Sequence, residues 1–148
     1  MKATLFEKPL DLKFLQISLR LGGLVTVAIG LAHLLFPGSG YSHNIPDSMP
    51  PAVRAHFYYL ATYAIATFLL SIGSISVLFS RLNHVPSAVL IACVLAVLWT
   101  ARFGLEILYP VEVRLFVMAR PSVILLPLIG VLAAFYLASA ALNLHRLA

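Results

Sequence analysis

The chain has 148 residues, of which 61% are hydrophobic and 10% are charged, and its formal net charge is +5. Soluble domains carry about 25% charged residues, so this composition excludes an ordinary soluble protein. The Lys and Arg residues lie scattered near the ends of apolar segments, which favours membrane lipids as partners and argues against nucleic acid.

Four apolar stretches reach the roughly 20 residues that a helix needs to cross a bilayer. Turn-forming residues such as Pro37-Gly38 and Pro86 separate them. We therefore expect an all-α fold: a polytopic integral membrane protein whose single domain, 1–148, is a four-transmembrane-helix bundle. The expected helices span about 13–36, 53–80, 87–109 and 122–144.

Small side chains recur at helical spacing in the first two spans, which suits close helix contact in lipid. We expect both rows to lie in helix–helix contacts, and the first span to be the central packing helix. The short connection at 81–86 predicts that the second and third spans are antiparallel neighbours. The two rows are Ser18, Gly22, Thr26 and Gly30, and Thr67, Ser71 and Ser74.

The two outer connections differ in character. Residues 37–52 form a long loop rich in Pro, Gly and Ser, whereas 110–121 alternate charged and apolar residues, as expected of a short helix in the membrane interface. Four spans place both termini on one side of the membrane. Six Lys and Arg lie on that side and four on the other, so we expect the N- and C-termini in the cytoplasm of a bacterial cell, at its inner membrane.

The stretch Thr100–Pro110 carries two charges inside the third span. Arg102 and Glu106 lie one helical turn apart and share a face, and charges at this depth usually pair or face a wet cavity. The topology brings further polar residues to the same end of the bundle. The resulting candidate cluster, ligand-binding or structural, comprises Arg102, Glu106, His33, His56, Tyr59, Arg54 and Arg120.

Several interpretations of this cluster stay open. The first is structural: Arg102 and Glu106 pair, and the histidines and tyrosines complete a hydrogen-bond network that fixes the helix packing. The second is a metal site, with Met49 or Met118 as an added soft ligand for copper. Its candidate nitrogen and oxygen ligands are His33, His43, His56 and Glu106, with Asp47 as a further carboxylate.

Two other ligands fit the same end of the bundle. Haem would need His33 and His56 to face each other across adjacent helices. A lipid headgroup or other amphipathic ligand would bind Arg102, with Glu106 as a titratable partner. The sequence holds no Gly-x-Ser-x-Gly motif and no phosphate-binding loop, so we predict no nucleophilic catalysis.

The segments His-Phe-Tyr-Tyr-Leu-Ala-Thr-Tyr (56–63) and Ala-Arg-Phe-Gly-Leu-Glu (101–106), within this four-helix layout, give the chain a resemblance to small bacterial membrane proteins of the DoxX-like group. The resemblance implies an accessory role beside other membrane proteins. We therefore expect a non-catalytic accessory or scaffold subunit that packs against partner membrane proteins or against copies of itself. The alternative is a metal-, haem- or lipid-binding protein that uses the polar cluster.

Overall fold

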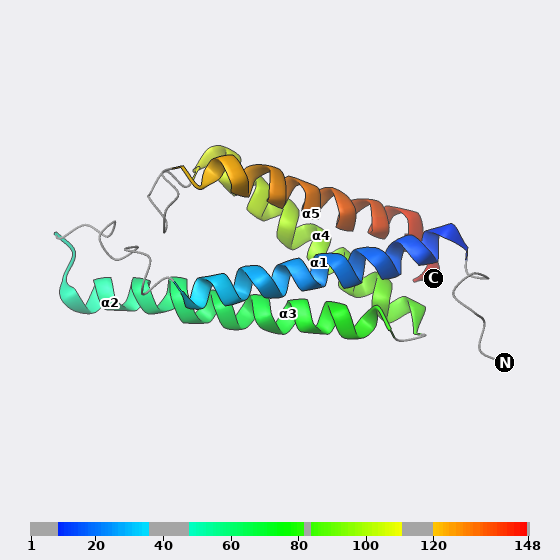
Figure 1. Cartoon of the computed structure of the whole chain (residues 1–148), viewed down its shortest axis with the longest axis horizontal. Helices are drawn as coiled ribbons and strands as arrows, with labels where there is room; N and C mark the ends of the chain where they lie inside the picture. The colour runs from blue at the N-terminus through cyan, green and yellow to red at the C-terminus, as the bar shows by residue number, and fades with distance from the viewer. Residues whose placement is uncertain (1–8, 36–47, 82–83, 111–119, 148) are drawn as a thin grey trace.

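The computed structural model describes residues 9–35, 48–81, 84–110 and 120–147, and within these ranges the protein is all-helical (Figure 1). Three helical segments without a break, α2, η3 and α3, make up the second span. Four spans are thus long and apolar enough to cross a membrane, and the predicted all-α bundle is confirmed. The helices are α1 (Leu10–Leu34), α2 (Pro51–Tyr59), the π-helix η3 (Leu60–Ala64), α3 (Ile65–Phe79), α4 (Val85–Leu108), α5 (Ser122–Asn143) and the 3-10 helix η4 (Leu144–Arg146).

The bundle consists of two closely packed antiparallel pairs, α1 with α3 and α4 with α5 (Figure 1). α1 contacts α3, α4 and α5, as expected of a central helix. The short connection between α3 and α4 does not make them a close pair, because their mutual contact is far less extensive than that within either pair. A short connection holds two helix ends together, but the side chains along the helices determine how closely they pack.

Glycine determines the closest approach of α1 and α3. A Cβ atom on Gly23 would lie 2.9 Å from the Gly73 carbonyl oxygen, and a Cβ on Gly73 would lie 2.9 Å from the Gly23 carbonyl oxygen. Any side chain at either position would therefore push the two backbones apart. The expected row on α1, Ser18 to Gly30, is indeed buried beside this contact.

The row of small residues on α3 does not face α1. Thr67, Ser71 and Ser74 are exposed on the outside of the bundle, whereas Gly73 and Ser76 are buried against α1. α3 carries small residues on two faces, so their spacing alone does not identify the face that packs.

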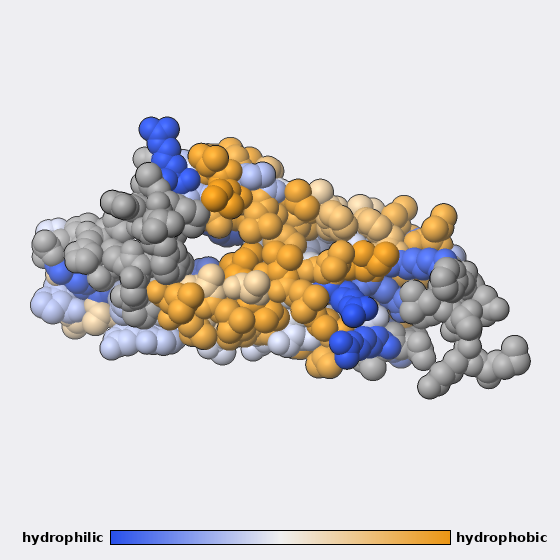
Figure 2. Space-filling model, in the orientation of Figure 1, coloured by the Kyte–Doolittle hydropathy of each residue, from blue (hydrophilic) through white to orange (hydrophobic). Residues whose placement is uncertain are grey.

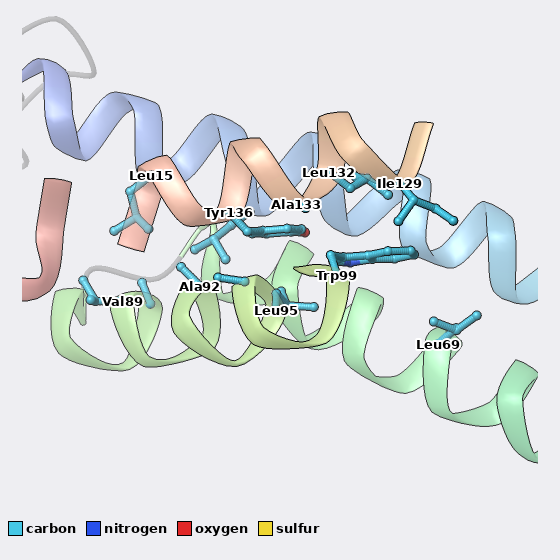
Figure 3. Close-up of a cluster of buried hydrophobic side chains, with 13 residues drawn as sticks. Leu15, Leu69, Val89, Ala92, Leu95, Trp99, Ile129, Leu132, Ala133 and Tyr136 are labelled. Atoms are coloured by element: carbon cyan, nitrogen blue, oxygen red, sulfur yellow. The ribbon is translucent and has the colours of Figure 1, made fainter. Parts of the chain in front are cut away.

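The apolar core lies between the two pairs and is shown in Figure 3. It extends from Leu15 at one end to Leu69 and Ile129 at the other. Tyr136 is fully buried at its centre, where its ring occupies the space that a Cβ on Gly22 would need. Its hydroxyl lies 3.4 Å from Ser76 Oγ, which also donates a 2.7 Å hydrogen bond to the Leu19 carbonyl.

Polar contacts also join α1 to the end of α5, at what we call the Asp11 end of the bundle. Arg146 forms a 2.5 Å ion pair with Asp11, and Asn143 Nδ2 donates hydrogen bonds to the carbonyls of Asp11 and Ser139. The start of the first span and the end of the last span therefore lie side by side. The opposite end, where α4 ends, is the Glu106 end.

α2 projects beyond the end of α1 at the Glu106 end (Figure 1). The continuous helix Pro51–Phe79 has 29 residues and α1 has 25. At 1.5 Å per residue the two measure about 43 and 37 Å, whereas the hydrocarbon layer is about 30 Å thick. No residue of α2 is buried, so this segment extends toward the membrane interface.

Candidate functional site

The centre of the candidate site is an ion pair on α4. Arg102 Nη2 donates a hydrogen bond to Glu106 Oε2 at 2.5 Å, so the pair that the helical spacing predicts is present. The Glu106 side chain is fully buried, whereas that of Arg102 is 36% exposed. Glu106 lies seven residues after the buried Trp99 and therefore continues the inward face of the helix.

The burial of Glu106 explains why the two groups stay together. A carboxylate inside an apolar bundle loses its hydration, and a neighbouring cation with a hydrogen bond restores much of the lost free energy. A guanidinium has five N–H donors, and the bond to Glu106 uses one of them. Glu106 thus holds a partly exposed cation in a fixed orientation.

His33 joins this pair from α1. Its Nδ1 donates a 2.9 Å hydrogen bond to the Ile29 carbonyl, because a carbonyl oxygen can only accept. The ring is half-buried near the end of α1, a helix that contacts α4. The structure therefore brings His33 to the same end of the bundle as Arg102 and Glu106, from two helices that do not follow each other in the chain.

The predicted site residues on α2 do not join this group. α2 packs mainly on η3, and the two segments together carry an aromatic collar formed by the exposed Phe57, Tyr59 and Tyr63 and the half-buried Tyr58. Tyr59 and Tyr63 stack with ring centroids 5.8 Å apart, and Tyr58 meets Tyr59 edge to face at 5.9 Å. Such a collar is typical of the membrane interface.

The other predicted site residues on α2, and the arginine that precedes α5, also lie outside this group. His56 is exposed and meets the Phe57 ring edge to face, while Arg54 is half-buried. Arg120 is exposed just before α5 begins. These three residues surround the Glu106 end and do not line the ion pair.

The metal and haem hypotheses both require candidate ligands from different helices to lie close together. Within the described ranges, no three His, Cys, Asp or Glu residues come together in a group that could hold a metal ion. His43, Asp47 and Met118 lie outside those ranges. The two haem-ligand candidates lie on elements that are not packed together, since His33 is in α1 and His56 is on the projecting α2.

Sequence reasoning missed two buried polar atoms near this end. Thr62 Oγ1 lies within the π-helix and Trp99 Nε1 lies in α4, and neither has a hydrogen-bond partner in the described part of the chain. π-helical turns often mark functional positions in membrane and soluble helices. The aromatic run around Thr62 is a signal in the sequence, but it does not reveal the change in helix type.

No protein-family model, no curated protein and no solved structure matches this chain. The DoxX-like resemblance stays a prediction. The geometry of the site is therefore what indicates its function. An oriented, partly exposed arginine, a buried glutamate and a histidine lie at the end of the bundle from which an aromatic collar projects.

Proposed function

We propose that this membrane protein is a non-catalytic accessory or scaffold subunit that packs against partner membrane proteins. The observation that carries this proposal is the outer face of α3. Thr67, Ser71 and Ser74 form a row of small hydroxyl side chains that is exposed on the bundle. α1 uses a comparable row to pack inside the bundle, whereas the row on α3 is exposed in the part of the chain that the structure describes.

Physical chemistry favours a protein partner for this row. Small side chains let a second helix approach the backbone closely, and hydroxyls can hydrogen-bond across the contact. Lipid tails offer neither benefit. The aromatic collar of Tyr59 and Tyr63 lies along the same continuous helix, so a partner helix could contact both surfaces.

The wider setting is part of the same proposal. A DoxX-like protein of the bacterial inner membrane, with both termini in the cytoplasm, would present the Asp11 end to the cytoplasm and the aromatic collar to the opposite face. The partner is another membrane subunit or a second copy of this chain.

Site-specific photocrosslinking in native membranes tests the proposal. A benzophenone amino acid replaces Ser71 in one variant and Val97, which is 72% exposed on α4, in a matched control. We expect a discrete adduct from position 71 and none from position 97, because the row on α3 is in contact with protein. An adduct of twice the chain mass would identify a second copy as the partner.

Purification in mild detergent gives an independent readout. The proposal expects a defined complex that contains the crosslinked partner. Equal diffuse labelling from both positions, together with a stable lone monomer, would contradict it.

A further inference from the structure

The two helix pairs diverge toward the Glu106 end. Figure 2 shows an opening between them near this end, with apolar atoms along its lower edge. Figure 3 places Trp99, Ile129 and Leu69 at the same end of the core, where they form its last layer. The core therefore stays apolar up to the end at which the opening lies.

Helix register places the ion pair beside this opening. Phe103 lies against Gly130, which sets the level of α5, and Tyr136 lies against Gly22, which sets the level of α1. Along these antiparallel helices, Arg102 and Glu106 lie level with the last two turns of α1, where His33 lies.

Arg102 is suited to bind an acceptor at this place. About a third of its side chain is exposed, and the fully buried Glu106 fixes one edge of the guanidinium. The remaining N–H donors are therefore oriented while part of the group stays accessible. Guanidinium groups prefer carboxylate and phosphate oxygens, which accept two of these donors at once.

The charge at this end favours an anion. Arg54, Arg102 and Arg120 lie at the Glu106 end of the described structure, against the single carboxylate of Glu106. An anionic headgroup would balance the remaining positive charge.

We propose that the opening binds an anionic amphiphile, with its oxyanion on Arg102 and its acyl chain across Trp99 and Leu69. The headgroup chemistry is a carboxylate or phosphate oxyanion, and its source is a free fatty acid or an anionic phospholipid. Glu106 acts as a positioning residue that holds the guanidinium. The inference does not depend on the proposed partner subunit, because the site lies within one chain.

Trp99 is the single tryptophan of the chain and lies in the core layer nearest the Glu106 end, so its fluorescence reports on this part of the bundle. The test uses the full chain in phosphatidylcholine nanodiscs, with dibrominated stearic acid added as a quencher at rising mole fraction. We expect saturable quenching. The methyl ester of the same acid, which has no charge, should bind about tenfold more weakly, because it lacks the charge-assisted hydrogen bonds.

A paired variant separates binding from folding. Arg102→Gln combined with Glu106→Gln removes both charges and leaves no stranded carboxylate, whereas Arg81→Gln is a matched control on an exposed arginine at the opposite end of the bundle. We expect the paired variant to lose the saturable phase and the control to keep it, with unchanged helix content by circular dichroism in both. Dibrominated phosphatidylglycerol, in a parallel titration, distinguishes a phospholipid from a free fatty acid by which of the two saturates at lower mole fraction.

Two results would overturn the proposal. One is quenching that rises linearly with mole fraction and is the same for acid and ester, which indicates bulk lipid contact. The other is saturable quenching that persists in a folded paired variant.

Discussion

Glu106 is, among the described residues, the charged side chain that the fold buries completely. Its position follows from helical geometry, since it continues the inward row that contains Leu95 and Trp99. An ionised carboxylate in such surroundings is stable only with a partner, and Arg102 supplies it from one turn away. The buried carboxylate of Glu106 therefore depends on the charge of Arg102.

This dependence gives a prediction for single and double substitutions. Arg102→Met should lower the free energy of unfolding by about 3 kcal/mol, because it leaves Glu106 buried without its cation. Arg102→Met combined with Glu106→Leu should recover most of that loss, because no charge remains. Thermal unfolding in detergent, followed by circular dichroism, measures the difference between the two variants.

Arg81→Met is the matched control, since this arginine is exposed at the end of the second span. It should change stability by less than about 0.5 kcal/mol. Equal destabilisation by the single and double substitutions would show that packing, and not the stranded charge, causes the loss.

Helix packing depends on glycines that have different surroundings. A Cβ on Gly23 would lie 2.9 Å from the backbone of α3, whereas a Cβ on Gly104 would meet no atom within 4 Å. The same substitution should therefore have opposite effects at the two positions. Overpacking costs about 1–3 kcal/mol, and replacing glycine by alanine inside an open helix gains up to about 1 kcal/mol.

We expect Gly23→Ala to lower the midpoint of thermal unfolding and Gly104→Ala to raise it or leave it unchanged. Both variants are measured in the same detergent as the unmodified chain. A fall of equal size at both positions would mean that the close contact between α1 and α3 does not limit stability.

The helices show how far the sequence could predict this site. The pairing of Arg102 with Glu106 is local, so the spacing of the two residues was enough to predict it. The position of His56 depends on the π-helix within the second span, which hydrophobicity does not reveal. The row Thr67–Ser74 is suited to helix contact, but its spacing does not tell which contact it makes, because Gly73 and Ser76 offer an equally small surface toward α1.

Polar contacts lie at both ends of the bundle, although the candidate cluster taken from the sequence lies at the Glu106 end. At the Asp11 end Arg146 pairs with Asp11, and the buried Asn143 donates a hydrogen bond to the Asp11 carbonyl. The two partners are 135 residues apart. Contacts between residues this far apart leave no local pattern in the sequence, so only the folded structure reveals them.

The orientation of the whole molecule gives the last prediction. Under the proposed orientation, a green fluorescent protein fused after Ala148 should fluoresce and an alkaline phosphatase fused there should be inactive, because the first folds in the cytoplasm and the second outside it. Cell fluorescence and phosphatase activity measure the two outcomes. An active phosphatase fusion would reverse the assignment of both ends.

The π-helix at Leu60–Ala64 has a consequence for how the aromatic collar is aimed. A π-helical turn closes its hydrogen bond over one residue more than an α-helical turn. One residue corresponds to about 100° of rotation in an α-helix. The π-helix therefore rotates Tyr58 and Tyr59 on α2 relative to the face that α3 packs on α1, compared with an unbroken α-helix. Gain or loss of a single residue in this segment would turn the collar around its axis and leave the bundle below it in register.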